Sequence, residues 1–185
     1  MSKKRNLIII AALIAVLSAV IAGAIFLSNH LQENEDIAAL VGDGATGNLV
    51  GQAAPDFKFL GEQGHVEMIS DYRGTPIVLN FWASWCPPCR MQKPFFQEAY
   101  DIYGNEVKFF MMNIDEPIEV ARAYMDEEGY TLPIYFDEAR EGAQAYGLTG
   151  VPETFFIDAE GIVRAHFVGP INMDTIRPSI EAILP

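Results

Sequence analysis

The sequence predicts an α/β sandwich with a mixed β-sheet, preceded by one transmembrane helix. Three observations support this prediction. Close to its N-terminus the chain has 21 consecutive uncharged residues, Leu7 to Leu27. Nearly continuous apolar runs at 75–82 and 107–114 are typical of strands that are covered on both faces. Helical patterns alternate with these strands, and a hairpin and a last helix follow them, which is the order expected in an α/β sandwich.

The N-terminal apolar run is long enough to cross a bilayer. As a helix it would span about 31 Å, close to the hydrocarbon thickness of about 30 Å. Lys3, Lys4 and Arg5 precede it and should stay in the cytoplasm, so residues 28–185 should lie outside the cell membrane. A cleaved signal peptide, with small residues at 22–24, is the alternative, but typical signal cores have only about 7–15 apolar residues. A retained single-pass anchor at 1–27 is therefore favoured.

The rest of the chain divides into a linker and one domain. Residues 28–50 are polar or small and predict a flexible linker, and 51–185 suit a single domain. Beyond residue 27 there are nine basic and 25 acidic side chains, a net charge of −16. So acidic a surface repels nucleic acid and anionic headgroups, which argues against nucleic acid as a partner.

The first half of the domain begins with a short hairpin, 57–60 and 65–68, around Glu62-Gln63-Gly64. The central strand 75–82 follows, and a helix over 87–103 ends at Gly104. Pro94 should bend this helix, because a proline in a helix interior removes a backbone hydrogen bond. Strand 107–114 then completes a parallel crossover pair.

The second half alternates in the same way. A helix over 116–128 has apolar residues on one side and ends at Gly129, and residues 132–136 are extended. A short helix over 138–146 ends at Gly147. Strands 154–158 and 162–168 form an antiparallel hairpin around Ala159-Glu160-Gly161. The last helix covers 173–184 and contains Pro178.

Cys86 and Cys89 are the only cysteines in the chain, and they lie where the central strand gives way to a helix. A disulfide that closes so short a loop stabilises a fold by only about 2 kcal/mol before strain, so a structural role gains little. The N-terminus of a helix instead favours a thiolate on the first cysteine. Cys86 is then the attacking sulfur and Cys89 the resolving one. Half of a zinc site is the alternative, but the three histidines are scattered singly, and we expect no metal.

Pro87 and Pro88 would occupy the first two helical positions after Cys86 as N-cap. Proline suits the first position because its missing N–H has no partner within the helix. Neither proline can donate a hydrogen bond to the sulfur, however. We therefore expect the pKa of Cys86 to lie below about 8.5 but well above the acidic extreme, as in a reductant or a moderate isomerase.

Four motifs together resemble the thioredoxin superfamily, and they span 51–185 in the family's order. The motifs are Ala54-Pro55-Asp56-Phe57 with Ser70-Asp71-Tyr72-Arg73-Gly74, then 78–89 ending in Trp85-Cys86-Pro87-Pro88-Cys89, then 150–158 beginning with Gly150-Val151-Pro152-Glu153-Thr154, and Gly169-Pro170. They are most similar to the membrane-anchored, extracytoplasmic oxidoreductases of the TlpA/ResA-like branch, which take part in cytochrome c maturation. The resemblance implies a thioredoxin-like three-layer sandwich with an extra N-terminal hairpin.

The resemblance also assigns further site residues. Val151-Pro152 matches the family's cis-proline loop, whose main chain would pair with an extended substrate. Trp85 would be a partly exposed lid beside Cys86. Asn80 stands where cytoplasmic thioredoxins keep a buried acid, and an amide cannot accept the proton of Cys89. Glu153 becomes the candidate base for that proton, with a surface glutamate as the alternative.

The resemblance implies a thiol-disulfide oxidoreductase that acts on protein disulfides or dithiols, needs no cofactor and is recharged by a membrane electron donor. Two alternatives stay open. The motif at 54–57 also occurs in thiol peroxidases of the peroxiredoxin type, although these place a threonine where this chain has Ala83. A copper- or haem-handling module would need ligands beyond the two sulfurs, although two thiolates alone can bind copper(I).

Overall fold

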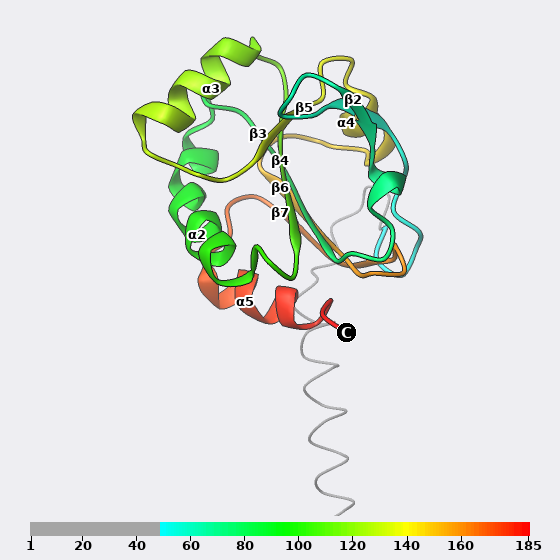
Figure 1. Cartoon of the computed structure of the whole chain (residues 1–185). Coiled ribbons are helices and arrows are strands. Elements are labelled where there is room, and N and C mark those ends of the chain that lie inside the picture. Colours follow the sequence, from blue (N-terminus) through cyan, green and yellow to red (C-terminus); the bar gives the residue numbers. More distant parts are fainter. Residues whose placement is uncertain (1–48) are drawn as a thin grey trace, which may run out of the picture. The chain divides into compact units, whose positions relative to one another are not determined.

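The computed structural model of the chain describes residues 49–185 (Figure 1). The predicted anchor at 1–27 and the linker at 28–50, apart from its last two residues, lie outside these residues. Within the described part, no helix is both long enough and apolar enough to cross a membrane. The predicted domain, 51–185, is almost entirely described.

Within residues 49–185, seven strands form one mixed sheet, in the order β2-β1-β5-β4-β3-β6-β7. The strands are β1 (Lys58–Leu60), β2 (Val66–Met68), β3 (Ile77–Trp82), β4 (Lys108–Asn113), β5 (Ile134–Phe136), β6 (Glu153–Ile157) and β7 (Val163–Val168). The strands β3, β4 and β5 are parallel, whereas β6 runs antiparallel to β3 and to β7. The strands β1 and β2 pair antiparallel, and β1 extends the sheet beyond β5.

Helices cover both faces of this sheet. They are α2 (Pro87–Tyr103), α3 (Ile118–Glu127), α4 (Glu141–Ala145) and α5 (Met173–Glu181), with a 3-10 turn, η1, at Ile69–Tyr72. Figure 1 shows α2, α3 and α5 on one side of the sheet and α4 on the other. The described residues accordingly form two hydrophobic clusters, one on each face, and both disulfide cysteines belong to the cluster under α2.

The observed elements match the expected order, with shorter ends that have local causes. The central strand begins at Ile77, because Pro76 before it has no N–H for a ladder bond. The helix α3 begins after Pro117, which is its N-cap, and α4 begins only after Arg140, which has a positive φ of 58°. The last helix ends at Glu181 with Ala182 as its C-cap.

The first residue of β6 differs from the prediction, and this determines where the side chain of Glu153 lies. The sixth strand begins at Glu153 rather than at Thr154, and it pairs Glu153 with Phe81 and Thr154 with Asn80. Because side chains alternate between the faces of a strand, Glu153 and Thr154 point to opposite sides of the sheet.

Candidate active site

The disulfide between Cys86 and Cys89 lies at the N-terminus of α2, with the two Cα atoms 5.3 Å apart. Cys86 is the N-cap and Pro87 and Pro88 occupy the first two helical positions, as predicted. The backbone N–H of Cys89 donates a hydrogen bond to Sγ of Cys86 at 3.2 Å. This is the first amide that the two prolines leave free to reach the sulfur.

The loop before β6 meets this sulfur from the other side. Val151-Pro152 is a cis peptide, as the family resemblance implied. The carbonyl oxygen of Val151 lies 3.5 Å from Sγ of Cys86, and the reduced thiol can donate a hydrogen bond to it. Trp85 is 58% exposed beside Cys86, whereas Cys86 is 3% exposed and Cys89 is fully buried. Cys86 is thus the more exposed of the two cysteines, and its sulfur lies against the main chain of Val151.

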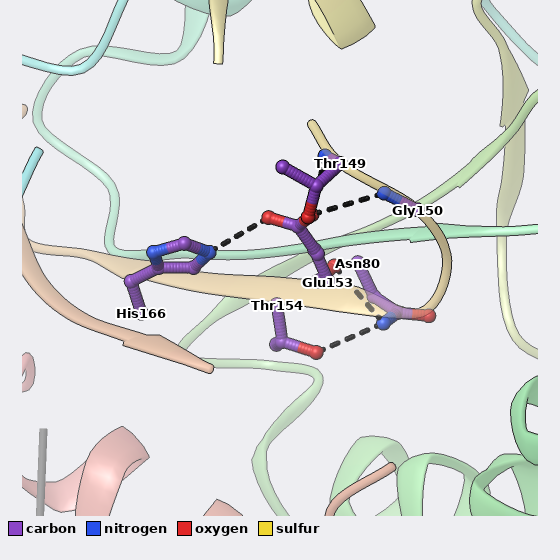
Figure 2. Close-up of polar contacts among 6 residues, drawn as sticks. All are labelled: Asn80, Thr149, Gly150, Glu153, Thr154 and His166. Atoms are coloured by element: carbon purple, nitrogen blue, oxygen red, sulfur yellow. Dashed lines mark hydrogen bonds and ion pairs between the residues drawn. The ribbon is translucent and has the colours of Figure 1, made fainter. Parts of the chain in front are cut away.

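A row of neutral polar side chains lies beneath α2. The Asn80 amide donates to the hydroxyl of Thr154 at 2.9 Å, which Figure 2 shows, and accepts from the Gln92 amide at 3.3 Å. The carbonyl oxygen of Gln92 in turn accepts from the N–H of Ile171 at 3.3 Å. Asn80 and Gln92 are amides and Thr154 is an alcohol, so this row offers no acceptor for the proton of the Cys89 thiol.

Glu153 lies on the opposite side of β6 from Thr154, as Figure 2 shows. Its carboxylate accepts from the N–H of Thr149 at 2.9 Å, from the Thr149 hydroxyl and from the N–H of Gly150 at 3.4 Å. His166 Nε2 lies 2.9 Å from its second oxygen. Burial raises the pKa of Glu153, but the hydrogen bonds from His166 and Thr149 outweigh burial and lower it overall.

The alternative that Glu153 is a surface residue is wrong, because Glu153 is only 2% exposed. The prediction that Glu153 is the base for the Cys89 proton is not supported either, because its carboxylate lies on the other face of the sheet from Cys89. It faces the cluster of Phe81 and Phe155, whereas Cys89 belongs to the cluster on the other face of the sheet. The contacts instead make Glu153 an anchor for the residues that lead into Val151.

Sequence reasoning did not single out Lys93. This side chain is fully buried in α2, one turn after Cys89, and its Nζ lies 3.5 Å from the centroid of the Trp82 ring. The spacing of four residues from Cys89 could have revealed it, because residues so spaced share one face of a helix.

Arg90 does not lie at the cysteines. Its guanidinium lies over the ring of Tyr124, and one of its nitrogens is 3.4 Å from the carboxylate of Glu128. Among residues 49–185, no three His, Cys, Asp or Glu side chains are grouped to hold a metal ion.

A thioredoxin-like α/β fold with a C-x-x-C disulfide at the start of a helix, next to a cis-proline loop, defines a class of proteins, the thiol-disulfide oxidoreductases. Residues 50–166 match the AhpC/TSA family, and the chain belongs to this family. The enzyme class is accordingly that of its relatives: a thiol-disulfide oxidoreductase of the ResA/DsbE type.

Three similar proteins illustrate the relationship. The chain is 33% identical to thiol-disulfide oxidoreductase ResA of Geobacillus kaustophilus over the full length of both. It is 31% identical to thiol:disulfide interchange protein DsbE of Vibrio cholerae, over 74% of this chain and 76% of that protein. A solved thiol:disulfide interchange protein of the thioredoxin family from Chlorobium tepidum superposes with a TM-score of 0.64 at 25% identity, covering 76% of this chain and all of the other.

Proposed function

We propose that this protein is a membrane-tethered, extracytoplasmic reductant of protein disulfides that serves cytochrome c maturation. The main support is the position of the Cys86 sulfur, which is the more exposed of the two cysteines and lies 3.5 Å from the main-chain carbonyl of Val151. The apolar run 7–27 with the basic residues before it supports a tether. The relatives named ResA and DsbE support this branch of the family.

In the proposed cycle the thiolate of Cys86 attacks a substrate disulfide, and one substrate sulfur leaves as a thiol. Cys89 then attacks the Cys86 sulfur of the mixed disulfide and releases the reduced product. The internal disulfide that results is reduced again by a membrane electron donor, which supplies two electrons and returns the protein to its dithiol form.

The first turn of α2 supports the reducing direction. The two prolines leave the Cys89 N–H as the donor that the structure shows on the Cys86 sulfur. A thiolate that accepts few hydrogen bonds from backbone N–H groups is less stabilised than one at a helix N-terminus without prolines. This favours a moderate pKa of Cys86 and a low reduction potential of the disulfide.

Substrate trapping tests the proposal. In the full-length Cys89→Ser variant the mixed disulfide on Cys86 cannot be resolved, so we expect partners to accumulate on membranes as covalent adducts that a reductant releases. A variant with both cysteines replaced by serine is the matched control. Apocytochrome c among the adducts would support the maturation role, and adducts that lack it and contain only other proteins would contradict that role.

A thiol peroxidase is the second candidate, because the matched family model is that of AhpC/TSA. The chain carries a fully buried Ala83 three residues before Cys86, where peroxidases of this type place a threonine. Stopped-flow oxidation of the dithiol by hydrogen peroxide distinguishes the two candidates. We expect a rate constant close to that of a free thiolate, and a rate orders of magnitude above it would favour the peroxidase.

A further inference from the structure

Lys93 is a buried amine without an obvious structural purpose. Its side chain is fully buried in α2, and its Nζ has no hydrogen-bond or ion-pair partner among the described residues 49–185. Burying an unpaired polar group destabilises a fold, and an apolar residue of similar size would fill the same space without that cost. A lysine here therefore calls for a role in the chemistry.

Lys93 and the resolving cysteine share one buried face of α2. It follows Cys89 by four residues on the same helix, where Cβ atoms are about 5–6 Å apart. Long side chains in a helix lean toward its N-terminus, which for Lys93 is the turn that carries Cys89. The amine lies on the Trp82 ring, and Trp82 belongs to the same hydrophobic cluster as both cysteines.

The surroundings of Lys93 favour the neutral amine. Burial lowers its pKa well below the usual value, and the negative charge of Glu116 only partly opposes this. The Glu116 carboxylate already accepts hydrogen bonds from Ser84 and Asn113. From α3, Tyr124 packs on Trp82, and burial raises its pKa to about 12, so it adds no charge at neutral pH.

The other described side chains at the site do not serve the same purpose. Asn80 and Gln92 beneath α2 are neutral amides, and the carboxylate of Glu153 is on the far face of the sheet. Lys93 is the titratable side chain that shares with Cys89 both the helix face and the burial. Once the disulfide is reduced, a buried thiol and a buried neutral amine on one helix face can form a donor and acceptor pair for one proton.

We propose that the neutral amine of Lys93 accepts the proton of the Cys89 thiol in the resolving step. This inference rests on the dithiol exchange described above. The Cys89 S–H bond breaks and an N–H bond forms on Lys93, giving a thiolate and an ammonium. The thiolate attacks Cys86 and expels the substrate sulfur with its electron pair. The ammonium then releases its proton to that sulfur or to water, which restores the neutral amine.

The test uses the reduced full-length protein and an aromatic disulfide that releases a coloured thiolate. Attack by Cys86 releases the first equivalent, and resolution by Cys89 releases the second, so stopped-flow absorbance follows the two steps separately. Lys93→Met and Lys93→Gln are compared with the wild-type protein. Lys108→Met is the matched control, because Lys108 lies on the ring of Tyr72, at 5.3 Å from its centroid, away from the cysteines.

We expect both Lys93 variants to keep the first phase and to slow the second by about tenfold or more, as for loss of a general base. Without the amine, Cys89 must lose its proton to solvent. The rate constant of the second phase should then rise about tenfold for each unit of increase in pH below the pKa of Cys89. The wild-type second phase should depend much less on pH. Lys108→Met should behave like the wild-type protein.

Three outcomes would overturn the proposal. One is a second phase with an unchanged rate in both Lys93 variants. Another is slowing without a change in the pH profile, which indicates altered packing alone. The third needs no variant: a wild-type second phase that already rises about tenfold per pH unit through neutral pH shows that solvent takes the proton. Absence of the first phase in the wild-type protein would instead contradict the thiol-exchange activity itself.

Discussion

At the scale of single residues, Glu153 shows how a buried charge can organise a loop. Its carboxylate accepts hydrogen bonds from Thr149 and Gly150, which lie just before Val151, and pairs with His166 on β7. The ring of His166 stacks on Phe155 with centroids 4.1 Å apart. The segment that places a carbonyl against Cys86 is therefore tied to the end of the sheet by one side chain.

Glu153→Gln should lower the free energy of unfolding by about 1–3 kcal/mol at neutral pH, because the amide keeps one oxygen for Thr149 and Gly150 but loses the oxygen that contacts His166 and the negative charge. The folded state lowers the pKa of Glu153, so its contribution is present above the unfolded value of about 4.3 and is lost as the pH falls through the folded pKa. Urea unfolding at neutral and acid pH measures this. The exposed Glu160→Gln is the control, and a deficit that does not change with pH would contradict the assignment.

At the scale of elements, α2 carries the chemistry at its first turn. The N–H of Cys89 is the donor on the Cys86 sulfur, and Pro88 occupies the position before it. Pro88→Ala adds an N–H at the second helical position, which an N-cap side chain can accept. We expect the pKa of Cys86 to fall in this variant, as measured by the rate of alkylation against pH. An unchanged or higher pKa would show that the prolines do not limit stabilisation of the thiolate.

Gln92 joins α2 to two other parts of the fold, β3 through Asn80 and the segment before α5 through Ile171. Gln92→Leu leaves a buried acceptor on Asn80 and the Ile171 N–H without a partner. It should therefore cost about 1–3 kcal/mol of stability. Urea unfolding measures the loss, and Gln97→Leu should cost less, because the hydrogen bonds that Gln97 makes to Asp101 and Thr131 are exposed to water. Equal losses in the two variants would contradict this account.

At the scale of the whole molecule, the proposed location depends on residues 1–27. We expect the full-length protein to stay in the membrane pellet after alkaline extraction, because 21 uncharged residues can span the bilayer. A variant that begins at residue 28 should move to the soluble fraction. Protease added to the outside of intact spheroplasts should digest the domain. Release of the full-length protein by alkali, or protection of the domain, would contradict the proposed topology.

Sequence patterns predicted the element order and the N-cap geometry of Cys86, because long apolar runs, glycine stops and proline positions are local signals. The orientation of Glu153 could not be predicted in the same way. The apolar pattern indicated a strand from Thr154 and left Glu153 in the loop. Glu153 is instead the first residue of β6, so the alternation along the strand turns its side chain away from that of Thr154. Lys93 was missed because lysines are seldom buried, so the residue type outweighed its spacing from Cys89.

The contact between Cys86 and the carbonyl of Val151 also bears on how such a protein can diversify. A peptide oxygen is present whatever amino acid the codon specifies, so point mutation at Val151 leaves it in place. A change of substrate specificity must therefore come from neighbouring side chains, and the exposed side chain of Trp85 is the first of these. Related proteins can in this way change their substrates while the redox-active cysteines and the main chain next to them stay the same.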